Sequence, residues 1–248
     1  MRMFGNARDV VALSAVSLLV FASPAAAELS LPPDSYVRGD IGGAFGQNLT
    51  FEDTNPNAPN CDLCGDLNPS TTGSSVLIGG GVGYRFGPMF RADLTMDYLT
   101  PFNVKGHSTA ASPSTGSAKL DALIGLANVY FDLAGAFPGG FGPFQPFVTA
   151  GIGVARDHLD TTTGTSALIG PFAIESHSRQ NLAWAFGAGV GYPLTPELAI
   201  ELAYKYLDTG QVRTGGTVVA GGQAFELTPS KTGDFVVHAV TVGVRYGF

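Results

Sequence analysis

The final eleven residues of the chain, HAVTVGVRYGF (238–248), alternate strictly between two kinds of side chain. Three valines and Tyr246 share one face of an extended chain, whereas threonine, glycine and Arg245 lie on the other face. Successive side chains of a β-strand point to opposite sides, so this period of two predicts a strand whose two faces meet different environments.

The same period of two recurs along the chain, and apolar residues do not recur at the spacing of three and four that a helix needs. Eight segments show it: 35–46, 75–86, 90–100, 119–133, 144–157, 181–194, 198–208 and 235–248. Short connections with proline or glycine alternate with four long polar ones: 47–74, 101–118, 158–180 and 209–234. This order predicts an all-β fold, an eight-stranded antiparallel up-and-down transmembrane β-barrel with four long outward loops.

The two faces of these segments indicate which side meets water. In 75–86, for example, Val76, Ile78 and Val82 lie opposite glycines and Arg85. A soluble barrel would bury the bulky face and expose the glycines, which are poor strand formers. In a membrane barrel the bulky side chains face lipid, and small or charged side chains fill a narrow interior. The pattern therefore favours the membrane barrel.

The segment 119–133 leaves its register open. Asn128 and Asp132 favour one orientation of the strand, whereas Leu120, Ile124 and Leu126 on the same face favour the other. A β-bulge in this strand would resolve the conflict.

Aromatic residues gather near the strand ends, as they do at the two interfaces of a membrane. We expect one girdle at the short-turn end and a looser one at the long-loop end. The first comprises Tyr36, Phe86, Phe90, Tyr130, Phe131, Phe147, Tyr192, Tyr246 and Phe248, and the second Phe45, Tyr98, Trp184, Tyr204 and Tyr206.

The N-terminus has the pattern of a secretory signal peptide. Arg2 and Arg8 precede the apolar run 10–22, and an A-x-A pattern ends at Ala27. We expect residues 1–27 to be removed and 28–248 to form the barrel domain. The apolar run is too short for a membrane-spanning helix, which needs about 20 residues. The formal net charge of −7 argues against nucleic acid as a partner.

Several stretches resemble a known family. SYVRGDIG, FQPFVTAGIGVA and LAWAFGAGVGYPLTPELAIELAYKYLDTG are similar to segments of small outer-membrane barrel proteins of the opacity/OmpA-like class, alphaproteobacterial type. The resemblance runs from about Tyr36 to Phe248 and implies location in the cell outer membrane. The ending Tyr246-x-Phe248 resembles the signal by which barrel-assembly machinery recognises its clients, so this machinery and outer-membrane lipids are expected partners.

Charged side chains on the inward face form the largest candidate site. They are Arg38, Asp40, Arg85, Arg91, Asp93, Asp97, Glu201, Lys205 and Arg245. They could line a pore, but the interior of an eight-stranded barrel has room only for side chains. We therefore expect a salt-bridged plug rather than a channel.

Other candidate chemistry is weaker. Cys61 and Cys64 lie in one long loop, where an oxidising compartment favours a disulfide over a redox motif or a zinc site. His177, Ser178 and Glu175 suggest a lipid-modifying hydrolase, but neighbours in a strand point to opposite faces. A metal or haem site between His158 and His177 has no further support. We expect no catalytic residue, no metal and no cofactor.

The sequence thus predicts a structural protein that interacts with an unknown surface partner through its extracellular loops, in adhesion or recognition. A narrow porin-like channel for small solutes is the alternative, and a lipid-modifying enzyme is a weaker one.

Overall fold

The computed structural model describes residues 32–52, 70–108, 113–226 and 229–248. The N-terminal segment 1–27 and both cysteines lie outside the described residues, so the signal peptide and the disulfide stay predictions. Among the described residues no helix is long and apolar enough to cross a membrane.

The described part is all-β, with one short helix, α1 (Leu133–Ala136). The long strands are β1 (Ser35–Gly46), β4 (Ser74–Arg85), β5 (Phe90–Ser108), β6 (Ser114–Asp132), β7 (Gln145–Leu159), β10 (His177–Pro193), β11 (Leu198–Arg213) and β14 (Lys231–Gly247). The short ones are β2 (Phe51–Glu52), β3 (Thr71–Thr72), β8 (Thr162–Ser166), β9 (Gly170–Ile174), β12 (Thr217–Ala220) and β13 (Gln223–Glu226).

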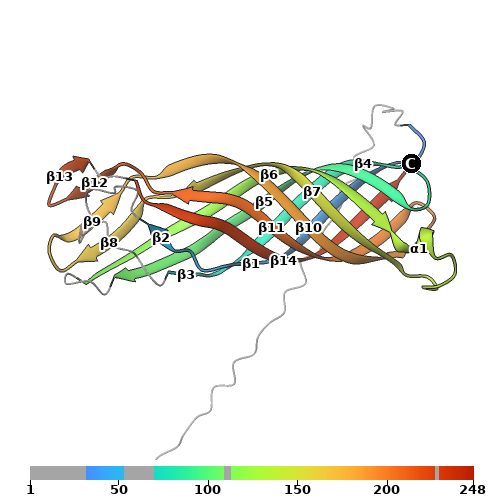
Figure 1. Cartoon of the computed structure of the whole chain (residues 1–248), viewed down its shortest axis with the longest axis horizontal. Helices are drawn as coiled ribbons and strands as arrows, with labels where there is room; N and C mark the ends of the chain where they lie inside the picture. Colours follow the sequence, from blue (N-terminus) through green and yellow to red (C-terminus); the bar gives the residue numbers. More distant parts are fainter. Residues whose placement is uncertain (1–31, 53–69, 109–112, 227–228) are drawn as a thin grey trace, which may run out of the picture. The chain divides into compact units, whose positions relative to one another are not determined.

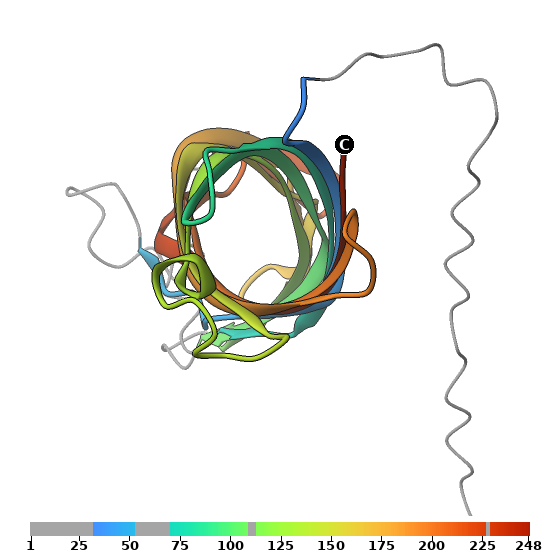
Figure 2. The same ribbon diagram turned by 90° about the vertical axis from the view of Figure 1, so that its right-hand side faces the viewer.

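The long strands pair antiparallel in chain order and close on themselves. β1 pairs with β4 on one edge and with β14 on the other, so that β14 completes the ring. Figure 2 shows this ring end-on. The closing strand of the sequence pattern, 235–248, is β14, and its partner on the other side is β11.

The strand count differs from the expected one. We predicted eight strands, and the described residues contain fourteen in a single sheet. The additional strands lie in the segments that we expected to be loops. β8 pairs with β6, β9 with β8, β12 with β9 and β13 with β12, which extends the sheet beyond the ring. In Figure 1 these strands lie at the end opposite α1 and the C-terminus.

The bulky apolar side chains lie on the outside of the ring, as the alternation predicted. Val240, Val242 and Val244 of β14 are exposed, and so are Leu182 of β10 and Leu202 of β11. Most of the expected girdle residues are also exposed: Phe86, Phe90, Tyr192, Tyr246 and Phe248 of the first girdle, and Phe45, Tyr98, Trp184 and Tyr204 of the second.

For three aromatic residues of the expected girdle, the predicted position on the outside of the barrel is wrong. Tyr36, Tyr130 and Phe147 are almost completely buried inside the ring. Tyr36 has the same parity along β1 as Arg38, and Tyr130 the same parity along β6 as Asp132, so the pleat directs both inward. The prediction that these residues lie at the membrane interface rested on their aromatic character alone.

The register of β6 is also settled. Leu120, Ile124 and Asn128 all point inward together, without a bulge on β6 between them. A register shift does occur, but in the facing strand β5, between Leu99 and Phe102. The conflict in the sequence arose because we expected only small and charged residues inside.

Candidate functional site

The interior of the ring contains two layers. The layer nearer the C-terminus is charged, and the layer nearer β8 and β9 is apolar. In the apolar layer, Leu77, Leu99 and Leu120 are fully buried. The rings of Phe102 and Phe235 pack edge to face there, with centroids 5.4 Å apart. This side-chain packing fills the interior at the level where the strands leave the apolar outer band.

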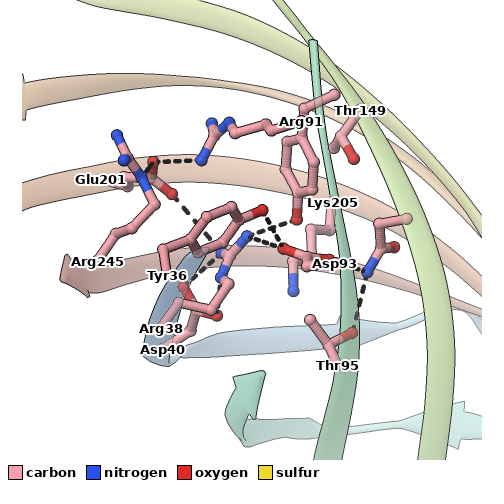
Figure 3. Close-up of polar contacts among 12 residues, drawn as sticks. Tyr36, Arg38, Asp40, Arg91, Asp93, Thr95, Thr149, Glu201, Lys205 and Arg245 are labelled. Atoms are coloured by element: carbon pink, nitrogen blue, oxygen red, sulfur yellow. Dashed lines mark hydrogen bonds and ion pairs between the residues drawn. The ribbon is translucent and has the colours of Figure 1, made fainter. Parts of the chain in front are cut away.

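Glu201 of β11 is the centre of the charged layer (Figure 3). Its Oε1 accepts hydrogen bonds from Arg91 Nη1 and from Arg245 Nε, both at 2.8 Å. Arg38 Nη2 lies 3.9 Å from the second oxygen. Glu201, Arg91 and Arg38 have nearly inaccessible side chains. A buried carboxylate is stable only where such charged partners replace water.

Arg38 joins a second group of acids. Its guanidinium binds both oxygens of Asp40, at 2.7 and 3.0 Å, which is the two-pronged geometry that arginine favours. It also lies 3.4 Å from Asp93 and contacts the Tyr130 hydroxyl. The Tyr36 hydroxyl donates to the same Asp93 oxygen at 3.1 Å. Buried tyrosines therefore act as polar partners of the network.

Two further contacts extend the charged layer. Lys205 Nζ lies 3.3 Å from Asp97, and Arg91 Nε donates to Asp132 at 3.2 Å. The guanidinium of Arg91 also stacks over the rings of Tyr130 and Phe147, 4.4 and 4.7 Å from their centroids.

Glycines in the facing strands make room for these side chains. A Cβ atom at Gly243 would lie 2.2 Å from an Asp40 oxygen, and one at Gly79 would lie 1.9 Å from Asp97. The glycines that marked the inward face in the sequence are therefore a packing requirement of the charged layer.

The structure brings together eight of the nine predicted interior charges. Arg85 differs, since it is half-buried at the mouth of the ring near the C-terminus and forms no ion pair with any described residue. Asp132 and Asn128 belong to the network although we did not include them among the site residues. Asn128 and Asp132 had indicated an inward register for this strand, but Tyr130 on the same face had been assigned to the outward girdle.

The histidines form no metal site among the described residues. His158 Nδ1 lies 2.8 Å from Ser178 Oγ on the neighbouring strand. Asp121 is opposite His158 in the next strand. No hydrogen bond joins Asp121 to the imidazole in the described part of the chain, so the three residues do not form a hydrogen-bonded triad.

At the end opposite α1, the short strands β8, β9, β12 and β13 form a surface beyond the ring. The β12–β13 hairpin turns at Gly221 and Gly222, which have φ of +58° and +79°. Two consecutive positive φ values are the requirement of a tight hairpin turn that matches strand twist. Val218 and Ile174 of this sheet are buried, whereas Val219 and Phe225 are exposed.

Comparison with known proteins identifies the family. The family described as outer membrane protein beta-barrel domain matches residues 13–248. The chain belongs to this family. It is a small outer-membrane β-barrel protein of the OmpA/opacity-like class, which confirms the resemblance seen in the sequence, and it is located in the cell outer membrane.

The chain is also similar to individual proteins. An uncharacterized protein of Brucella abortus (strain 2308) is 30% identical over 198 residues, which cover 68% of this chain and 67% of the relative. A Rickettsia felis protein named "Putative adhesin" is 24% identical over 249 residues, covering 96% and 99% of the two chains. The crystal structure of Neisserial surface protein A covers 87% of this chain and 97% of its own, with 14% identity and a TM-score of 0.49.

Proposed function

We propose that this protein is an eight-stranded membrane anchor that presents an extracellular sheet to a surface partner, in adhesion or recognition. The strands β1, β4, β5, β6, β7, β10, β11 and β14 would cross the membrane, with their outward apolar side chains in contact with outer-membrane lipids. The observation that carries the proposal is the extension β8–β9–β12–β13, which continues the sheet beyond the apolar band.

Two features support binding rather than transport. The interior is filled by the charged layer and by the packed rings of Phe102 and Phe235, which leaves the proposed anchor closed. The Rickettsia felis relative, which aligns along nearly the whole chain, carries the name "Putative adhesin". We place the function on the extracellular sheet and assign no catalytic role.

Export and assembly complete the proposal. Residues 1–27 would direct the chain through the inner membrane and be removed. Tyr246 and Phe248 would be read by the barrel-assembly machinery. Their rings pack edge to face, 5.3 Å apart between centroids, and both are exposed on the outside of the closing strand.

The test is an adhesion assay with a non-adherent Gram-negative host that displays the full chain. In one variant, Gly-rich turns replace the β8–β9 and β12–β13 hairpins. We expect adhesion to eukaryotic cell layers to fall to that of cells without the protein, while folded barrel in the outer membrane stays unchanged. The control shortens the connection around α1 at the opposite end and should adhere like the wild type. Equal adhesion of both variants would contradict the proposal.

A further inference from the structure

The connection between β6 and β7, residues 133–144, forms an apolar surface at the end of the ring where α1 lies; we call it the α1 turn. Its sequence, LAGAFPGGFGPF, contains no charged residue. Phe137, Phe141 and Phe144 have 59%, 38% and 52% of their surface exposed. The rings of Phe137 and Phe141 pack edge to face, with centroids 6.4 Å apart. Exposed apolar patches mark interaction surfaces, and neither the charged layer nor the extracellular sheet accounts for this one.

The backbone of the α1 turn is held against a neighbouring turn. The amide of Asp132 donates to the carbonyl oxygen of Met89 at 2.8 Å. A Cβ atom at Gly135 would lie 2.0 Å from the carbonyl oxygen of Pro88, so α1 is in close contact with the turn between β4 and β5. Figure 2 shows the α1 turn, in yellow-green, along the outer wall of the ring and not across its opening. The exposed phenylalanines therefore belong to the outside of the barrel.

The apolar outer face of the barrel continues into the α1 turn. Val129 of β6 and Val148 of β7 are exposed on the two strands that flank it. The ring of Phe144 contacts that of Tyr192 on β10, with centroids 5.7 Å apart. One apolar surface thus runs from the outward face of the strands to the phenylalanines of the turn.

The chemistry of this surface favours lipid over a protein partner. No side chain from Leu133 to Phe144 can form a hydrogen bond. Protein interfaces surround their apolar centre with a polar rim and carry about one hydrogen bond per 100–200 Å². Insertion at the boundary between headgroups and acyl chains requires only apolar area, and aromatic rings are well suited to that depth.

We propose that the α1 turn binds the periplasmic leaflet of the outer membrane and gives the barrel a second, interfacial contact with lipid. The proposal rests on the proposed function, which places this end of the ring in the periplasm. In membrane barrels the aromatic girdles flank the lipid-facing band of the strands, and the periplasmic connections are short turns. The α1 turn differs, because its phenylalanines lie outside any strand and hold the β6–β7 side of the barrel at the membrane surface.

Single-tryptophan reporters test the contact in the full chain, refolded into phosphatidylcholine vesicles. Trp184 is the only tryptophan, and Trp184→Phe provides the background. The reporters Phe137→Trp and Phe141→Trp keep an aromatic ring at each position, and heat-modifiability on gels verifies that each variant is folded. The vesicles contain phosphatidylcholine with bromine at a shallow or a deep position of the acyl chain. Each reporter should lose about half of its fluorescence to bromines about 5–10 Å below the headgroups, and less to bromines at the chain end.

The control is Leu168→Trp in the same background, at an exposed position of the β8–β9 turn at the opposite end. It should keep its fluorescence in both kinds of vesicle. The contact is overturned if the two reporters are quenched no more than the control, which would leave a protein as the occupant of the surface, or if deep bromines quench them more than shallow ones. If the control also stays unquenched, the proposed function stands. Quenching of the control alone would contradict the proposed function, because the sheet that should face water would lie in lipid.

Discussion

Glu201 illustrates how a single buried residue organises the interior. Its carboxylate accepts from Arg91 and Arg245 and lies close to Arg38, so that three strands besides its own depend on it. The charge was recognisable from the sequence because Glu201 alternates with Ile200 and Leu202. Arg38, Arg91 and Arg245 were also predicted to point inward, but their pairing with Glu201 was not, because ring closure alone brings these strands together.

Glu201→Gln should lower the free energy of unfolding by about 3–5 kcal/mol, since it leaves buried arginines without their anion. The measurement is urea unfolding of the protein in lipid vesicles. Glu197→Gln makes the same chemical change at an exposed position and should alter stability by no more than about 0.5 kcal/mol. Equal effects of the two changes would show that the charged layer does not contribute to stability.

Asp157 provides a pH test outside the membrane-spanning part. It lies on β7 beyond Val154, the last exposed apolar residue of that strand, and is fully buried, with one oxygen accepting from Asn181 at 2.8 Å. Burial raises the pKa of this carboxyl to about 7. Between about pH 4 and pH 7 the folded state therefore holds a proton that the unfolded chain releases, so stability falls as the pH rises through this window.

Asp157→Asn should remove this part of the pH dependence. Urea unfolding between pH 4 and pH 8 should show a flatter profile for the variant than for the wild type. Asp160→Asn, a change at an exposed position three residues away, should retain the wild-type slope. Identical slopes for wild type and Asp157→Asn would show that this carboxyl titrates normally.

At the scale of the strand, the alternation of side chains was the most informative signal. Leu202 and Glu201 are neighbours in β11, yet one is exposed outside and the other is buried inside. Leu202→Arg should obstruct insertion, because an arginine facing lipid near mid-membrane costs about 2–4 kcal/mol. The readout is the fraction of heat-modifiable, folded protein in the outer membrane.

A control for this change places arginine on the outside but beyond the apolar band. Ser178→Arg on β10 meets this condition, since Ser178 is exposed and lies past Leu182. It should insert like the wild type. If both arginine variants insert equally well, the outward face of β11 does not contact lipid.

The parts that the sequence missed depend on distant pairing. The faces of β4, β5 and β14 follow from the local pleat, so a period of two predicts them. The pairing of β9 with β12 joins residues 170–174 with 217–220, and no local pattern identifies that partner. The threonines of TTTGTS (161–166) do alternate, but their position beside β6 follows only from the pairing of β8 with that strand. Apolar residues inside the ring, such as Leu99, contradicted the assumption of a wholly polar interior.

For the molecule as a whole, the two interior layers decide between an anchor and a channel. Charged side chains neutralise one another around Glu201, and the apolar layer above them packs around the rings of Phe102 and Phe235. Ions would have to displace both layers to cross. The strands that extend the sheet beyond the ring, β8, β9, β12 and β13, then present a surface for binding and do not gate a channel.

The purified full chain in planar lipid bilayers should therefore show no steady conductance at moderate voltage, because the charged layer and the packed rings of Phe102 and Phe235 occupy the interior. Heat-modifiability of the same preparation on gels verifies that the barrel is folded and inserted. The double variant Arg91→Ala/Phe102→Ala removes one large side chain from the charged layer and one from the apolar layer. If this variant still inserts, its conductance should be higher than that of the wild type. Discrete, reproducible current steps from the wild type would contradict the closed anchor and favour a narrow channel for small solutes.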